Sequence, residues 1–291
     1  MTIAHEIGRR LPVARGGTRG TEPAGAEPGR GAVRPLDGAR SPTLSFVAEL
    51  AGVAAGLIAL WWAAVLIFAP PPYLLPGPDR VAAAFVTRFD DLAANTLVTG
   101  GEIVLGLLLG TAVGLATALG MAYWPATRRL VLPVVVVLQS LPVFAIAPVL
   151  VLWFGFGLAS KVVMASLIIF FPVASAFHDG LSRTDPGLLD LAVLYRARRW
   201  QTLSMIRIPA ALPALVSGLR MAAAVAPIGA VVGEWVGSSS GLGLLMMHAN
   251  ARLQTDTMFA ALVIVAALAV ALRLAVDLLT RRLVPWLPET A

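Results

Sequence analysis

Long runs of apolar residues, separated by short charged or proline-rich stretches, restrict the fold of this sequence more than any other feature. These runs approach the roughly 20 residues that an α-helix needs to cross the hydrocarbon core of a bilayer. Lipid offers no hydrogen bonds to backbone N–H and C=O groups, so such runs cross a membrane as helices. The charged fraction of 13% is about half that of a soluble domain. We therefore expect an all-α integral membrane protein.

The apolar runs predict about six membrane spans. A triple proline, Pro70-Pro71-Pro72, follows the first span and Pro125 follows the second, because proline disfavours continuation of a helix. Residues 79–94, between these spans, are weakly amphipathic and are expected to lie along the membrane surface. The predicted spans are residues 46–68, 103–124, 130–154, 161–177, 210–233 and 258–276.

The segments outside the spans are expected to be tails and loops. Residues 1–45 are rich in Gly, Ala, Pro and Arg and lack an apolar period, so we predict a disordered tail with no secretory signal. A transmembrane domain over residues 46–284 follows, and residues 285–291 form a short C-terminal tail.

The distribution of basic residues predicts the orientation. Cytoplasmic loops carry an excess of Lys and Arg. If the N-terminus is cytoplasmic and six spans alternate, sixteen of the 22 basic residues lie inside and four outside. Both termini are therefore predicted to be cytoplasmic. The four outer residues are Arg80, Arg88, Lys161 and Arg252.

Several functional classes are not expected from the composition. The chain has no cysteine, which excludes disulfides and thiolate metal sites. Its net charge of +6 is not gathered on a basic face of the kind that nucleic acids require. HExxH and GxxxxGK[ST] motifs are absent, and the three histidines lie too far apart to share a ligand. We expect no enzyme active site, no cofactor, no metal and no nucleic-acid partner.

The long loop between the fourth and fifth spans carries the most informative pattern. Asp185 followed by Pro186 predicts a helix start, with an N-cap acceptor and then proline at the first helical position. Apolar residues then recur at helical spacing, interrupted by three arginines at 196–199. We predict two short helices joined by a turn, over about residues 179–208. They suit either a lever that docks on another protein or an amphipathic helix that rests on lipid.

This loop resembles the signature loop of the permease subunits of ABC importers, a Glu-Ala-Ala triplet followed at fixed spacing by Gly and by Ile-x-Leu-Pro. Asp190, Leu191 and Ala192 stand in the triplet here, Arg196 in the Gly position, and Ile206 to Pro209 in the ending. Gly permits a conformation that costs other residues about 1 kcal/mol, so the turn is expected to differ or the coupling to be weaker. The resemblance implies coupling helices that contact a separate cytoplasmic ATPase, with these contacts: Asp190, Leu191, Ala192, Arg196, Ile206 and Pro209.

The resemblance extends over residues 70–286. Residues 75–78 (LPGP), 139–142 (QSLP) and 152–155 (LWFG) resemble the nitrate, sulfonate and taurine branch of these permeases. Residues 233–237 (GEWVG) and 241–243 (GLG) most resemble permeases for pyrimidine precursors of thiamine, such as hydroxymethylpyrimidine.

This similarity implies a type I importer permease in a bacterial inner membrane, surrounded by lipid. It implies a second permease copy, expected to be identical, two copies of the ATPase and an extracytoplasmic solute-binding protein. A thiamine pyrimidine precursor is the expected cargo, with sulfonates, taurine, nitrate or riboflavin as alternatives. A secondary transporter driven by an ion gradient is the competing class, which inverted repeats would favour.

Polar side chains at membrane depth are candidates for the translocation pathway, because they are costly there. Glu234, beside Trp235 near the outer end of the fifth span, suits either the pathway or a local hydrogen bond. Gln139 and Ser140 precede Pro142 in the third span, where proline frees a backbone carbonyl. They suit either a polar rung of the pathway or contacts between helices.

Two further features of the spans have simpler explanations. Glu102, Arg220 and Arg273 lie near span ends, where snorkelling to the interface is expected. Small residues recur every fourth position in the second span, which favours close helix packing, within the subunit or with a second copy. They are Gly106, Gly110 and Gly114.

Overall fold

The structure, a computed structural model, describes residues 42–281 and 283–284. All regular elements among these residues are helices, which confirms the all-α prediction. The chain divides into two units after Gly52, and the helices that follow α1 all belong to the second unit. Residues 1–41 of the predicted N-terminal tail lie outside the described residues, and residues 42–45 belong to α1. The predicted C-terminal tail also lies outside them.

Four helical segments of the described chain are long and apolar enough to cross a membrane, and the bent pair of α4 and α5, counted as one span, makes a fifth. The described residues 52–68 of α1 form a shorter apolar helix. The helices are α1 (Pro42–Phe68), α2 (Pro78–Thr87), α3 (Phe89–Tyr123), α4 (Pro125–Ser140), α5 (Val143–Phe154), α6 (Leu158–Ser182), α7 (Pro186–Leu194), α8 (Arg199–Thr202), the π-helical turn η1 (Leu203–Arg207), α9 (Ile208–Gly237), α10 (Leu242–Ala251) and α11 (Thr255–Arg281).

The third predicted span is broken rather than continuous. Helix α4 ends at Ser140, and α5 leaves it at an angle of 108°. Pro142 has no N–H to donate and disfavours the helical conformation at Leu141, which is extended with ψ of 132°. The sequence predicted a span over residues 130–154, and the structure divides these residues between α4 and α5.

The second span begins earlier than predicted. Helix α3 starts at Phe89 and contains 35 residues, so the surface segment predicted over residues 79–94 is only α2 and the first turns of α3. Asp90 and Asp91 in the first turn favour this start because carboxylates stabilise a helix N-terminus. Apolar content alone missed these turns because they carry polar side chains.

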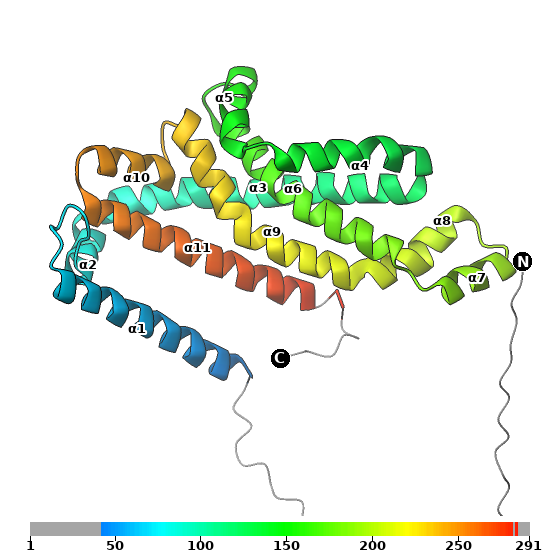
Figure 1. Cartoon of the computed structure of the whole chain (residues 1–291), viewed down its shortest axis with the longest axis horizontal. Coiled ribbons are helices and arrows are strands. Elements are labelled where there is room, and N and C mark those ends of the chain that lie inside the picture. The colour runs from blue at the N-terminus through cyan, green and yellow to red at the C-terminus, as the bar shows by residue number, and fades with distance from the viewer. Residues whose placement is uncertain (1–41, 282, 285–291) are drawn as a thin grey trace, which may run out of the picture. The chain divides into compact units, whose positions relative to one another are not determined.

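Helix α6 packs along both α3 and α9 (Figure 1). A Cβ atom at Gly110 of α3 would lie 2.7 Å from the Ser166 carbonyl oxygen of α6, so only glycine allows this approach. Gly106 and Gly114 also lie against α6. Of the two explanations for the glycine repeat, the structure therefore shows packing within the subunit.

The two ends of the second unit differ in their elements. Helices α2 and α10 lie at one end, and α7 and α8 lie at the other (Figure 1). The predicted coupling loop is thus at the opposite end from the loop that connects α9 to α11.

Candidate functional site

The coupling segment, residues 183–209, begins as its sequence predicts. Asp185 is the N-cap of α7, and its Oδ1 accepts a hydrogen bond of 2.8 Å from the Gly187 N–H. Pro186 occupies the first helical position. This pairing stabilises the start of α7 because it satisfies one of the N–H groups that a helix leaves free.

Arg196 takes the conformation that a glycine would favour. Its φ is +51°, in the left-handed region. The Ala197 N–H donates to the Ala192 carbonyl and the Arg196 N–H to that of Val193, each at 2.9 Å. These two bonds form a Schellman motif, in which the left-handed position is usually glycine. Arginine there costs about 1–2 kcal/mol, so the chain keeps this turn at some cost in stability.

The second predicted short helix is not a separate element. Residues 199–237 form one continuous helical segment through α8, η1 and α9, so the prediction that the second short helix ends at about residue 208 was wrong. The Ile208 N–H donates to the Leu203 carbonyl, five residues earlier. A π-helical turn of this kind accommodates Pro209 because the hydrogen-bond ladder is already shifted there. The coupling segment is therefore joined directly to a membrane-crossing helix.

Both sides of this junction are anchored in the bundle. Leu203 is buried in the main apolar core, together with Phe177 of α6. The ring of Trp200 meets that of Tyr123 of α3 edge to face, with centroids 6.4 Å apart. Arg207 also donates a hydrogen bond to the Ala122 carbonyl of α3. The segment is thus fixed at its base.

The segment also exposes large apolar side chains, beside the charged residues Asp190, Arg196, Arg198 and Arg199. Asp190 and Leu191 are exposed, Ala192 is buried, and Ile206 and Pro209 are partly buried. Exposed apolar patches mark sites of interaction with another protein or with lipid. We call the following exposed residues the coupling face: Leu188, Leu191, Val193, Leu194, Tyr195 and Trp200.

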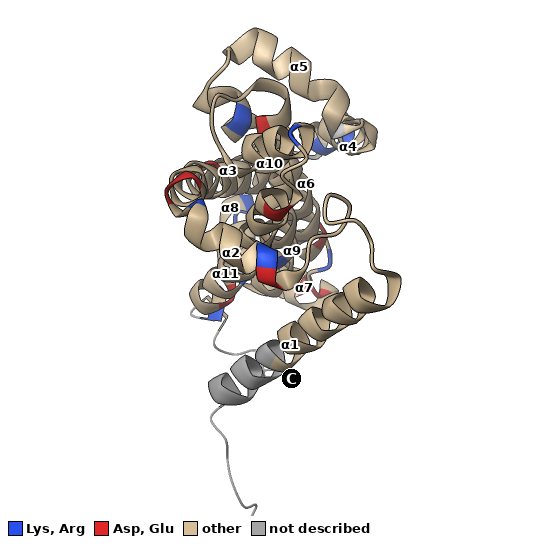
Figure 2. Cartoon of the chain, turned by 90° about the vertical axis from the view of Figure 1, so that its left-hand side faces the viewer, with Lys and Arg blue, Asp and Glu red and all other residues tan. Residues whose placement is uncertain are grey.

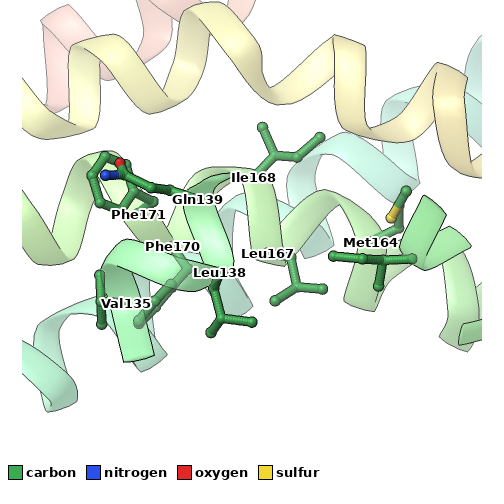
Figure 3. Close-up of a pocket in the computed structure, with 9 residues that line it drawn as sticks. Val135, Leu138, Gln139, Met164, Leu167, Ile168, Phe170 and Phe171 are labelled. Atoms are coloured by element: carbon green, nitrogen blue, oxygen red, sulfur yellow. The ribbon is translucent and has the colours of Figure 1, made fainter. Parts of the chain in front are cut away.

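A cavity of about 190 Å³ lies between α4, α5 and α6 and contains one of the predicted pathway residues. The amide of Gln139 is the one polar side chain among the nine that line it (Figure 3). Ser140 instead donates to the Val137 carbonyl at 2.8 Å, and Pro142 forms the bend. The other lining residues are Val135, Leu138, Ile146, Met164, Leu167, Ile168, Phe170 and Phe171.

Glu234 and Trp235 do not line this cavity, and they face different neighbours. Glu234 is fully buried and accepts hydrogen bonds from the Thr99 hydroxyl, at 2.6 Å, and from the Gly243 N–H. The Trp235 indole N–H donates to the Gly243 carbonyl at 3.0 Å. Its ring stacks on Phe144 of α5, with centroids 6.3 Å apart. Of the two interpretations of Glu234, a pathway residue or a local hydrogen bond, these contacts fit the local hydrogen bond.

Glu102 and Lys161 form a buried ion pair that was not predicted from the sequence. Lys161 Nζ lies 3.0 Å from Glu102 Oε1, and both side chains are at most 5% exposed. Lys161 was expected in an outer loop, and Glu102 was expected to snorkel. Both expectations were wrong, because α6 begins at Leu158 and encloses Lys161 within the bundle. The sequence did offer one signal of this pair: Lys161 is the only lysine among the 22 basic residues of the chain.

The other two ionisable residues assigned to snorkelling are also paired. Arg220 of α9 and Arg273 of α11 both contact the Asp277 carboxylate, at 2.7 and 3.1 Å. All three side chains are partly exposed. Seen from the α2 and α10 end, basic and acidic residues of the described chain are intermixed and form no single patch (Figure 2).

The features above describe an all-helical chain with several helices that are long and apolar enough to cross a membrane, and comparison with known proteins defines its family. Residues 102–287 match the family described as binding-protein-dependent transport system inner membrane component, and the chain belongs to this family. It is therefore a multi-pass membrane permease subunit of an ABC importer and not an enzyme. In this class ATP is hydrolysed by a separate subunit, and membership implies an ATPase and a solute-binding protein as partners.

Relatives within the family differ in the transport function that their names give. A probable ABC transporter permease of Haemophilus influenzae is 49% identical over 78% of this chain and 93% of its own length. The formylaminopyrimidine transport permease of Halalkalibacterium halodurans is 34% identical, over 74% of this chain and 86% of its own. The riboflavin transport permease of Chloroflexus aurantiacus is 35% identical, over 79% and 87%.

A solved structure supports the fold. The inward-facing MetNI methionine ABC transporter matches with a TM-score of 0.60 and 20% identity, over 67% of this chain and 97% of that chain. The fold prediction, a type I importer permease, is confirmed.

Proposed function

We propose that this permease serves the uptake of a small planar heterocycle, with a pyrimidine precursor of thiamine as its cargo. The observation that supports this cargo is the composition of the cavity. Its lining is hydrocarbon and aromatic, with one amide and no charged side chain. A sulfonate, taurine or nitrate would instead favour cationic or multiple N–H donors. A neutral ring with a few polar atoms suits a pocket of this composition.

The size of the cavity favours a small ring over riboflavin. Its volume of about 190 Å³ lies below the roughly 300–1,000 Å³ of pockets that enclose drug-sized ligands. The relative named for formylaminopyrimidine transport agrees with this choice. The riboflavin relative is as similar in sequence, so the cavity is the discriminating observation.

Uptake into proteoliposomes that contain the permease, its ATPase and its binding protein would test the cargo. Formylaminopyrimidine should be taken up, and unlabelled riboflavin or taurine should not compete. Gln139→Leu should reduce uptake about tenfold because the amide loses its hydrogen bond to the ring, whereas Ser140→Ala, which does not line the cavity, should have little effect. Uptake of taurine or riboflavin in preference to the pyrimidine would contradict the assignment.

In our proposal the cytoplasmic ATPase docks on the coupling face, which includes Leu191, and on the neighbouring residues Asp190, Arg196, Ile206 and Pro209, while the buried Ala192 packs beneath them. Support comes from the exposed apolar surface on a segment whose base is fixed in the bundle. Closure of two ATPases would push this lever and α9 together, and so switch the helices between inward-open and outward-open states.

Two matched charge reversals test this coupling. Asp190→Lys should abolish ATP-dependent uptake and copurification of the ATPase. Asp90→Lys makes the same change at an exposed position near the opposite end and should preserve both. Uptake that survives ATP depletion but collapses with an uncoupler would instead indicate a secondary transporter.

Helix α9 presents a face suited to a second, identical copy. Its exposed residues recur at spacings of four, three, four and seven, which places them on one side of the helix, as in helices that pack side by side in membranes. Because the chain has no cysteine, Ile228→Cys should give a disulfide-linked dimer in the membrane. Leu108→Cys, exposed on α3, should not. The face comprises Ser217, Met221, Ala224, Ile228 and Trp235.

Both termini are cytoplasmic in this proposal. The excess of arginine near the ends of the chain and in the coupling segment supports this orientation. A cysteine at Leu194, on the coupling face, should then react with a membrane-impermeant maleimide only after cells are permeabilised.

A further inference from the structure

The N-terminus of α10 is held by side chains from two other helices. The first N–H groups of a helix have no partner within it. At this terminus the Gly241 N–H donates to Asn95 Oδ1 of α3 at 2.6 Å, and the Leu242 N–H donates to Thr99 Oγ1 at 2.8 Å. The next N–H, that of Gly243, donates to the Glu234 carboxylate of α9. Three consecutive donors are thus satisfied from outside α10.

The glycines on either side of Leu242 allow the Glu234 carboxylate to approach. Gly241 has a φ of +122°, and a Cβ there would collide with that carboxylate. A Cβ at Gly243 would lie 2.7 Å from Glu234 Oε2 and 2.9 Å from the Val231 carbonyl oxygen. The Gly-Leu-Gly sequence is therefore the complement of this buried acid.

The Glu102–Lys161 pair is next to the residues that bind the N-terminus of α10. Glu102 follows Thr99 by one turn of α3, and Glu102 and Lys161 interact electrostatically with Glu234. A Cβ at Gly233 of α9 would lie 3.4 Å from the Lys161 Cα, so α6 and α9 meet there. The cluster therefore connects four helices: α3, α6, α9 and α10.

Such a cluster is a poor device for stability alone. Well-packed apolar residues often stabilise a core as well as a buried ion pair does, because the charges lose their hydration. In a membrane protein, buried ionisable groups are by default candidates for function. The geometry that this cluster fixes is the position of α10.

Trp235 extends this geometry to α5. Both backbone polar groups of Gly243 are bound: its N–H donates to the Glu234 carboxylate, and its carbonyl accepts from the Trp235 indole N–H. The Trp235 ring in turn stacks on Phe144, just after the 108° bend. Displacement of α10 would therefore release Trp235 from one of its two fixed contacts.

We propose that Asn95, Thr99 and Glu234, supported by the Glu102–Lys161 pair, are positioning residues that clamp α10 and thereby hold Trp235 against Phe144. The clamp stands at the end opposite to the coupling segment (Figure 1). It controls when α5 moves relative to α9 during transport. This last step rests on the proposed transport function, whereas the clamping of α10 does not.

Cysteine labelling tests the clamp separately from transport. Ala249 of α10 is 2% exposed, so Ala249→Cys, the one cysteine of the permease chain in the complex, should react slowly with a maleimide. Adding Thr99→Val or Glu234→Ala should raise the labelling rate about tenfold, the effect expected from loss of a buried hydrogen-bond partner. Met247→Cys, which is exposed on the same helix, gives the rate for a free site. Asp277→Asn, which breaks an ion network elsewhere, should leave Ala249→Cys protected.

The same variants are then measured for ATP-dependent uptake. Thr99→Val and Glu234→Ala should reduce uptake about tenfold at normal complex yield, and Glu234→Gln, which keeps an acceptor oxygen, should restore part of it.

Unchanged protection of Ala249→Cys in both clamp variants would overturn the proposal, whatever the uptake. Faster labelling with normal uptake would overturn the role of the clamp in transport. If Glu234→Ala fails to assemble, the milder Thr99→Val decides. A wild-type complex without uptake would contradict the transport assignment alone.

Discussion

The buried pair of Glu102 and Lys161 gives the sharpest prediction on stability. Their charged atoms are 3.0 Å apart, and the two side chains are 0% and 5% exposed. Removing one partner leaves a buried charge uncompensated, which typically costs about 3–5 kcal/mol. Lys161→Met should therefore lower the free energy of unfolding by about that amount. The double variant with Glu102→Gln should recover most of the loss, because the Glu102 carboxylate is no longer left without its partner.

Reversible unfolding of the purified permease in mixed micelles, followed by far-ultraviolet circular dichroism, would measure both effects. The coupling energy from the double-mutant cycle should exceed about 2 kcal/mol. Arg273→Gln is the control, because its partly exposed contact with Asp277 should be worth about 1 kcal/mol or less. If the two single losses simply add in the double variant, the pair does not act as a unit and the reasoning fails.

Three further predictions concern other parts of the chain. Arg196→Gly should stabilise the coupling segment by up to about 1 kcal/mol because its φ is positive, whereas Arg196→Val should destabilise it, as thermal unfolding would show. Gly110→Leu should prevent assembly of the bundle because even a Cβ meets the α6 backbone, and size-exclusion chromatography would then show aggregation. An amine-reactive ester should modify Lys161 only after denaturation, a difference that peptide mass spectrometry detects; rapid modification of the native protein would contradict its burial.

Local chemistry allowed the sequence to predict much of the fold. Apolar runs identify membrane helices because the bilayer demands satisfied backbone groups, whatever the rest of the chain does. The start of α7 was equally accessible, since Asp185 and Pro186 act on their own neighbours. The small residues of α3 predicted close packing, although the sequence did not identify α6 as the partner.

The features that the sequence could not predict depend on residues far apart in the chain. Glu102 resembled an interfacial residue until α6 placed Lys161 beside it. Glu234 was singled out for its cost in the membrane, but its partners are Thr99 and the backbone of α10. The break at Pro142 and the continuous helix at Pro209 show a further ambiguity. A proline signals a local change in hydrogen bonding, which becomes a sharp bend in one case and a π-helical turn in the other.

The continuous segment from Arg199 to Gly237 connects the two functional regions. Its 39 residues correspond to a length of roughly 58 Å, with Trp200 of the coupling face near one end and Glu234 of the α10 clamp near the other. A rod held at both ends transmits force between them unless it bends. Pro213 and Pro227 lie inside α9, and kinks in helices occur mostly at such positions. Motion of the coupling segment should therefore either displace the residues of the α10 clamp or bend α9 at these prolines. Replacing both by alanine should strengthen the dependence of uptake on Glu234.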